Sequence, residues 1–117
     1  MISYPKRGEI YWVRLDPAIG SEIKKTRPAL IISNDIGNRY SERVIIAPIT
    51  SKGSARVFPF EVALPKGSAE LGEDSKVLLD QIRSVDKSRL ERKIGKLSME
   101  AMKKIDLAIH LSLGLVD

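Results

Sequence analysis

Gly20–Ile32, with the sequence GSEIKKTRPALII, joins a charged loop to a continuous apolar run. Gly20 permits backbone conformations that other residues resist, and Pro28 disfavours a helical conformation at Arg27. The segment is therefore expected to be an extended loop that enters a β-strand and presents its charges at the mouth of that strand. A carboxylate, two lysines and an arginine collected there make a candidate anion site.

The strand pattern continues on both sides of this segment. Strands are predicted over Glu9–Asp16, Ala29–Ser33, Val44–Ile49, Arg56–Leu64, Lys76–Val85 and Lys93–Leu97. The first is apolar on both faces. The fourth alternates, which would place Phe58, Phe60, Val62 and Leu64 on one face. Between the second and third, Asn34–Asn38 has a helix cap followed by a breaker and predicts one or two helical turns.

The C-terminal part of the chain changes to a helical period. Met102, Ile105, Ile109 and Leu113 recur at helical spacing, and Ser98 is a suitable N-cap, so a helix is predicted over 99–114. Short strands followed by one amphipathic helix indicate an α+β fold, a small β-barrel or strongly twisted sheet with a helix packed on it. The 117 residues show no repeat or linker and are expected to form a single domain over residues 1–117.

Composition restricts the compartment and the partners. The chain has no cysteine, which excludes a disulfide scaffold and a cysteine nucleophile. It also lacks an apolar stretch long enough to span a membrane, and its start lacks the apolar core of a signal peptide, so a cytoplasmic protein is expected. Residues 1–60 hold ten Lys or Arg against five acids, whereas residues 61–117 hold ten of each. This excess of positive charge favours a polyanionic partner.

Five short motifs occur in order along the chain. They are Arg7-Gly8-Glu9-Ile10-Tyr11, Gly20-Ser21-Glu22 with Arg27-Pro28, Ser33-Asn34-Asp35, Ile49-Thr50 and Asp80-Gln81-Ile82-Arg83-Ser84. Together they resemble the MazF/PemK family of toxin endoribonucleases. The resemblance implies an SH3-like barrel of the PemK/CcdB type that works as a homodimer. It also implies cleavage of single-stranded RNA at short sequence motifs without a metal or other cofactor, and inhibition by an acidic antitoxin.

Metal-free RNA cleavage needs a base for the 2′-OH, a proton for the leaving 5′-oxygen and a cation for the developing charge. No histidine pair is present, and the single histidine, His110, is expected to be a solvated helix residue. Glu22 is the available base, and the planar fork of Arg27 can hold two phosphate oxygens. The resemblance implies that Arg27 and Thr50 are the catalytic pair. Since an arginine keeps its proton in water, an electrostatic role is favoured for Arg27.

Several polar side chains could meet phosphates or base edges. These RNA-binding candidates are Ser21, Lys24, Lys25, Lys52, Arg56, Gln81 and Arg83. A solvated charge is an equally good interpretation of each. Gln81 and Arg83 are predicted to share one face of their strand, and Gln81, as a polar residue in an apolar strand, needs a partner. Tyr11 and Trp12 suit core packing or a dimer interface better than base stacking. The residues Ile23–Thr26 differ from many relatives, so the relatives' cleavage sequence does not transfer.

Two functional classes remain open from the residues alone. One is a ribonuclease toxin. The other is a noncatalytic protein of the same barrel architecture, such as a gyrase-directed toxin or a nucleic-acid-binding module, which would need the basic patch but not Arg27 and Thr50. Dimerisation is predicted from the two-sided apolar first strand and from the excess apolar residues of the helix, which are Leu111, Leu113, Leu115 and Val116.

Overall fold

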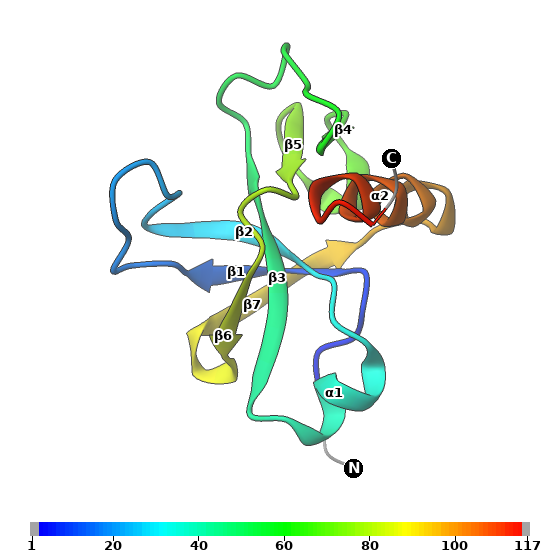
Figure 1. Ribbon diagram of the computed structural model, residues 1–117. Coiled ribbons are helices and arrows are strands. Elements are labelled where there is room, and N and C mark those ends of the chain that lie inside the picture. Colours follow the sequence, from blue (N-terminus) through cyan, green and yellow to red (C-terminus); the bar gives the residue numbers. More distant parts are fainter. Residues whose placement is uncertain (1–2, 116–117) are drawn as a thin grey trace.

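Seven antiparallel strands and two α-helices make up the computed structural model, which describes residues 3–115. In chain order they are β1 (Glu9–Arg14), β2 (Thr26–Ile31), α1 (Asp35–Tyr40), β3 (Arg43–Thr50), β4 (Glu61–Leu64), β5 (Ser75–Leu78), β6 (Arg83–Asp86), β7 (Leu90–Lys96) and α2 (Met99–Ser112). Short 3₁₀ turns occupy Ser68–Glu70 and Lys87–Arg89. The predicted α+β class, with a twisted sheet and a C-terminal helix, is confirmed (Figure 1).

Strand β3 is the centre of the sheet. One of its edges pairs with β2, and its other edge pairs with β6 along the first half and with β5 along the second half. The strand order is β4-β5-β3-β2-β1-β7, with β6 beside β3. In Figure 1, β3 runs lengthwise from α1 to the loop that precedes β4. No pairing joins β4 to β7 among the described residues, so the barrel is not closed.

Both faces of the central strands are apolar, as the pattern of the first strand predicts. On one face, Ile10, Leu30 and Ala47 pack in a cluster that includes residues of α2. On the other face, Val13, Leu15, Ala29, Ile31, Val44, Ile46 and Val85 form a second cluster. A side-chain period of two places neighbouring residues of a strand in different clusters, which explains why these strands are nearly all apolar.

Both predicted helices are present, with their predicted caps. The Asn34 side chain accepts from the Gly37 amide at the start of α1, and the Ser98 side chain accepts from the Ala101 amide at the start of α2. Helix α2 ends at Ser112, two residues before the predicted end. Of the apolar residues expected to mediate dimerisation, Val116 lies outside the described residues. No helix in residues 3–115 is long and apolar enough to cross a membrane.

All six predicted strands have different bounds in the structure. Strand β2 begins at Thr26 instead of Ala29, so Arg27 and Pro28 lie in the strand and not in the loop before it. The strand predicted over Lys76–Val85 is broken into β5 and β6 by a turn at residues 79–82. The break faces Ala47–Pro48, the residues of β3 that pair with neither β5 nor β6, and Pro48 has no amide hydrogen to donate.

The strand predicted over Arg56–Leu64 contains only Glu61–Leu64, so Phe58 and Phe60 lie in the preceding loop. Pro59 between them cannot donate to a neighbouring strand, which favours a loop at this point. Strand β7 begins at Leu90, earlier than predicted. The prediction missed this start because Glu91–Lys93 are charged residues of an exposed edge strand and show no apolar pattern.

Candidate active site

Arg27 and Thr50 come from neighbouring strands of the sheet. Strands β2 and β3 pair Leu30 with Ala47 and Ala29 with Pro48. The same register, continued by two residues, sets Arg27 opposite Thr50, and residues opposite one another in an antiparallel pair share a face. On the other edge of β3, Thr50 pairs with Lys76. An arginine, a threonine and a lysine therefore form a row across three strands.

The same two residues line one pocket at the end of the sheet. Trp12 of β1, Ile94 of β7 and the segment Glu70–Glu73 complete its walls. The Arg27 Nε donates to the Lys24 carbonyl at 3.1 Å, and none of the four ion pairs among the described residues involves Arg27. The Thr50 Oγ1 accepts from the Lys52 amide at 3.1 Å. The arrangement brings together the two residues that the resemblance marks as catalytic.

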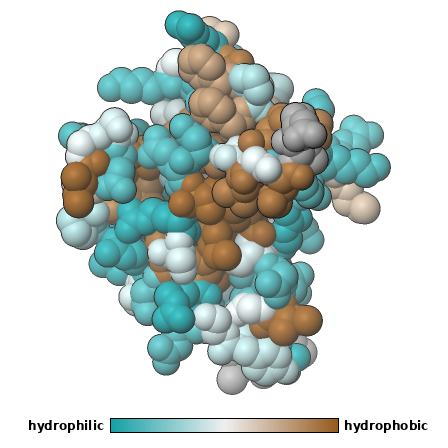
Figure 2. Space-filling model, in the orientation of Figure 1, coloured by the Kyte–Doolittle hydropathy of each residue, from teal (hydrophilic) through white to brown (hydrophobic). Residues whose placement is uncertain are grey.

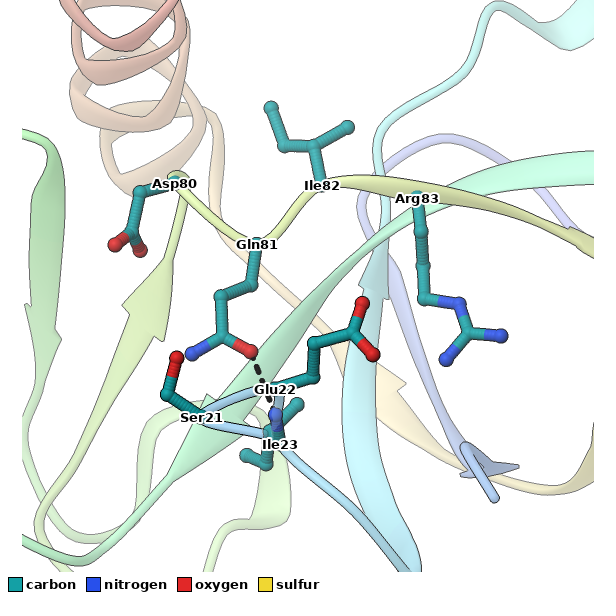
Figure 3. A pocket seen from close by; sticks show the side chains of 7 residues that line it. All are labelled: Ser21, Glu22, Ile23, Asp80, Gln81, Ile82 and Arg83. Carbon is teal, nitrogen blue, oxygen red and sulfur yellow. Dashed lines mark hydrogen bonds between the residues drawn. The ribbon is translucent and has the colours of Figure 1, made fainter. Parts of the chain in front are cut away.

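Glu22 lies in a second pocket, together with three of the predicted binding residues. This pocket is lined by Ser21, Glu22, Ile23, Asp80, Gln81, Ile82 and Arg83 (Figure 3). The Glu22 carboxylate accepts from the Ile19 amide at 2.6 Å and so closes a turn of its own loop. In Figure 3 it lies between the Gln81 amide and the Arg83 guanidinium. Glu22 does not line the Arg27–Thr50 pocket, and its role as a base stays a prediction.

Gln81 finds the polar partner that the sequence requires, but in a different place. It lies in the turn between β5 and β6, not in a strand, so the expectation that Gln81 and Arg83 share one strand face is wrong. Its Oε1 accepts from the Ile23 amide at 2.7 Å, which attaches the Gly20–Lys25 loop to the sheet (Figure 3). Arg83 donates from Nη1 to the Leu15 carbonyl at 2.9 Å. Gln81 therefore holds the loop itself at Ile23, and Arg83 holds the chain at Leu15, just after β1.

The remaining binding candidates lie on exposed loops. Lys24 is exposed beside the Arg27 contact, and Lys52 and Arg56 are exposed in the loop after Thr50. Lys25 has a left-handed backbone, with φ of 70°, and lines a third pocket with Arg14, Asp16, Thr26, Ser88 and Arg89. No group of three His, Cys, Asp or Glu side chains is arranged to hold a metal ion within residues 3–115.

The structure tests the predicted environments of Tyr11, Trp12 and His110. Tyr11 is half-buried and packs against the second apolar cluster, which agrees with a core role. Trp12 is also half-buried, but it lines the Arg27–Thr50 pocket. His110 is exposed on α2, where its Nδ1 is 2.8 Å from the Asp106 carbonyl oxygen, as expected for a surface residue.

Sequence reasoning missed the residues that hold the loop after Thr50. Lys76 is buried in β5, with a side chain 10% exposed, and its Nζ forms an ion pair of 2.9 Å with Glu61. The same Nζ donates to the Arg56 carbonyl at 2.8 Å. The available signal was a lysine directly before the apolar run Val77–Leu79, since a lysine that is buried in a strand needs a carboxylate partner.

Fold and pockets together define a small α+β protein with a polar, arginine-containing site where adjacent antiparallel strands end. Residues 6–113 match the sequence model of the PemK-like, MazF-like toxins of type II toxin-antitoxin systems. The chain is 44% identical over 112 residues to Endoribonuclease EndoA of Bacillus subtilis (strain 168), covering 96% of this chain and 97% of that protein. The chain therefore belongs to the family of PemK-like, MazF-like toxins.

Solved structures agree with this assignment. MazF from Deinococcus radiodurans superposes with a TM-score of 0.81 at 30% identity, covering 97% of this chain and 99% of that chain. An endoribonuclease from a mycobacterial species, solved in complex with its cognate antitoxin, superposes with a TM-score of 0.80 at 28% identity, covering 97% and 98%. The similarity thus extends over almost the whole length of the chains.

Proposed function

We propose that this chain, as one domain over residues 1–117, is the toxin of a toxin-antitoxin system and a metal-independent endoribonuclease that cleaves single-stranded RNA at short sequence motifs. The observation that carries the proposal is the placement of Arg27 opposite Thr50 in one pocket, with the Arg27 guanidinium outside every ion pair of the described residues. Family membership and the endoribonuclease relative support it.

In the proposed reaction, the 2′-OH of one nucleotide loses its proton and attacks the adjacent phosphorus. The bond to the 5′-oxygen of the next nucleotide breaks, and that oxygen takes up a proton and leaves as a 5′-hydroxyl. Arg27 would hold two phosphate oxygens and stabilise the negative charge that develops on them. The Thr50 hydroxyl would donate to the same phosphate.

Glu22 is the candidate base, on condition that its loop moves. Because the carboxylate lies in the neighbouring pocket, the Gly20–Lys25 loop would have to carry it toward the phosphate. Seven residues, three of which line the pocket of Glu22, are proposed to bind RNA: Ser21, Lys24, Lys25, Lys52, Arg56, Gln81 and Arg83. We also propose a homodimer in the cytoplasm, inhibited by an acidic antitoxin, in line with the antitoxin complex of the mycobacterial relative.

The decisive experiment is cleavage of a mixed pool of single-stranded RNA in the presence of EDTA, with mapping of the cut ends. We expect products with a 5′-hydroxyl that polynucleotide kinase can phosphorylate, and no reaction when the nucleotide before the cut lacks its 2′-OH. Arg27→Ala should lower kcat/KM roughly 10²–10³-fold with an almost unchanged Tm. Arg92→Ala, an exposed arginine of β7, is the matched control.

Three results would contradict the proposal. Cleavage of the 2′-deoxy substrate would exclude attack by the 2′-OH. Full activity of Arg27→Ala would place the site elsewhere. RNA binding without cleavage by the wild-type protein would favour the noncatalytic alternative of the same fold.

A further inference from the structure

The loop Ser51–Phe60, directly after Thr50, presents an aromatic ring to solvent. Phe58 is 40% exposed, so much of its ring is not used for core packing. The ring stacks on Phe60, with centroids 5.6 Å apart and an angle of 4° between the planes. The Arg56 guanidinium carbon lies 5.1 Å from the Phe58 centroid. The Lys76 Nζ also lies over the Phe58 ring, 5.8 Å from its centroid. Arg56, Phe58 and Phe60 thus form one exposed cluster, here called the aromatic platform.

The platform is held rigidly by the buried ion pair of Glu61 and Lys76. The Glu61 carboxylate accepts from the Phe58 amide at 3.0 Å, and the Glu61 amide donates to the Phe58 carbonyl at 2.8 Å. Lys76 fixes the Arg56 carbonyl at 2.8 Å. Because these hydrogen bonds already order the backbone at Phe58, binding of a ligand would require little further ordering of the loop and would lose little affinity to it.

The platform is also connected to the catalytic pair. Lys76, whose Nζ donates to the Arg56 carbonyl of the platform, is the strand partner of Thr50 in the β3–β5 pairing. The Lys52 amide at the start of the same loop donates to the Thr50 hydroxyl. A nucleotide next to a phosphate bound at Thr50 would therefore meet this loop, whose exposed charges, Lys52 and Arg56, are positive.

We propose that the aromatic platform binds one nucleobase of the RNA substrate by stacking on Phe58, beside the phosphate held by Arg27 and Thr50. This assignment rests on the ribonuclease function proposed above. Single-stranded RNA is commonly bound by bases stacked on aromatic rings and by arginine contacts to phosphate. Because every base has a π-face, the platform would contribute affinity and register more than the choice of cleavage motif.

The test is the affinity of a single-stranded RNA that carries one 2′-deoxy nucleotide at the mapped cut, so that it binds without reacting. Fluorescence anisotropy should show a Kd roughly five- to a hundredfold weaker for Phe58→Leu, which keeps the apolar bulk but loses the π-face. Phe58→Trp should bind like the wild type. Equal melting temperatures of the variants would show that the fold is retained.

The chain offers a matched control at the opposite end of β3. Tyr40 is 74% exposed on α1, and the Arg39 guanidinium carbon lies 5.2 Å from its ring centroid. It is thus an aromatic ring with an arginine over it, like Phe58, but it belongs to α1, which precedes β3 (Figure 1), whereas Thr50 is the last residue of β3. Tyr40→Leu should leave the RNA affinity unchanged.

Removing single bases from the same RNA locates the contact. At one position near the cut, an abasic nucleotide should weaken binding to the wild type but not to Phe58→Leu, because the stacking is already lost in that variant. Arg56→Gln should reduce the slope of log K against log salt by about one.

Several outcomes would overturn the platform. Wild-type affinity of Phe58→Leu, in a protein that cleaves RNA, would refute the platform while leaving the ribonuclease function intact. Wild-type affinity together with a fall in molecular mass by light scattering would mean that Phe58 contacts a second copy of the chain instead. A wild-type protein that neither binds nor cleaves RNA would refute the ribonuclease function and the platform together.

Discussion

Arg27 and Thr50 present hydrogen-bond donors for which residues 3–115 supply no acceptor. Arg27 commits its Nε to the Lys24 carbonyl, which leaves the two Nη groups for a bidentate contact with phosphate oxygens. Thr50 accepts from the Lys52 amide, so its own hydroxyl hydrogen is available to donate. The two contacts orient the side chains without neutralising them, and a phosphate would meet donors that are already ordered.

Glu9, at the start of β1, is the residue whose titration should affect stability. Burial by itself would raise the pKa of Glu9, but hydrogen bonds from Lys93, the Lys6 amide and Tyr11, with the Lys93 charge, outweigh it and hold the pKa below its usual range. A lowered folded-state pKa stabilises the fold above the pKa of the unfolded chain, and this stability is lost as the pH falls through the folded value.

Glu9→Gln should therefore lower the free energy of unfolding by about 1–3 kcal/mol at neutral pH, and the difference from the wild type should shrink below about pH 4. Urea unfolding across this pH range measures it. Burial and the neighbouring Glu9 raise the pKa of Tyr11 to about 12, so the phenol should ionise at lower pH in Glu9→Gln. Glu91→Gln is the control, since its contact with Arg14 at 3.6 Å is exposed. If the difference in unfolding free energy between Glu9→Gln and the wild type stayed constant down to strongly acidic pH, the lowered pKa of Glu9 would be contradicted.

At single positions, the sequence predicted which charged residues lie near the candidate site, but it did not predict the hydrogen bonds that hold their side chains. The family resemblance, and not the residue pattern alone, paired Arg27 with Thr50, and the register of β2 and β3 then places them opposite one another. Gln81 was correctly expected to need a partner, but that partner is a backbone amide, Ile23 N, and a backbone contact leaves no trace in side-chain patterns. Phe58 fitted an alternating pattern only because the pattern ignored Pro59 and the Glu61 contacts.

Among the elements, β3 and β5 hold the candidate site together. Thr50 ends β3, Lys76 lies opposite it on β5, and Glu61 begins β4. The ion pair between Lys76 and Glu61, with side chains 10% and 7% exposed, connects the strands to the loop that follows Thr50. A buried ion pair of this kind adds little net stability to the fold, but removal of only one partner destabilises the fold strongly because the other charge stays buried.

Lys76→Met should lower the free energy of unfolding by about 3–5 kcal/mol, because it leaves the Glu61 carboxylate buried without its cation. Lys76→Met with Glu61→Leu should recover most of that loss, since no unpaired charge remains. Chemical denaturation of the two single variants and the double variant gives the coupling energy. Additive losses would show that the two side chains do not act as a pair. The surface pair Arg14–Glu91 is the control for the cycle.

The segment Ser68–Glu73 depends on a close contact with β7. A Cβ at Gly95 would lie 2.3 Å from the Ala69 carbonyl oxygen, so the chains approach as only glycine allows. Gly95→Ala should push this segment away and lower the free energy of unfolding by about 1–3 kcal/mol. Gly72→Ala is the matched control in the same segment, because no atom lies within 4 Å of its Cβ position and no change is expected. Thermal unfolding of both variants decides, and equal Tm values would contradict the contact.

At the level of elements, apolar periodicity predicted most of the sheet and the position of α2. Apolar periodicity failed where the pairing with a neighbouring strand, and not the strand's own sequence, determines where the strand begins or ends. The segment Lys76–Val85 was predicted as one strand, but on this edge of β3 neither β5 nor β6 pairs with Ala47–Pro48, so the strand divides there. The start of β7 was missed because its first residues are mostly charged. An edge strand needs only one apolar face, so such residues are tolerated there.

Across the molecule, apolar surface remains after both clusters are filled. The two-sided pattern of the first strand does not require a partner chain, because β1 lies between β2 and β7 and its two faces are covered within one chain. Helix α2 and the residues that follow it are different, since Leu107 and Leu111 of the helix and Leu113 and Leu115 after it all stay exposed. Figure 2 shows hydrophobic surface across the middle of the drawn face. Exposed apolar side chains of this kind are typical of an interface.

The homodimer can therefore be tested at the end of α2. Leu111→Glu with Leu113→Glu should convert a dimer into a monomer at micromolar concentration, because a glutamate is tolerated on an exposed surface but is expensive to bury in an interface. Light scattering measures the mass, and the Tm extrapolated to low protein concentration should stay unchanged. Met99→Glu, an 82% exposed position at the other end of α2, is the control and should remain dimeric. A wild-type monomer, or a double variant that still dimerises, would show that α2 is not the interface.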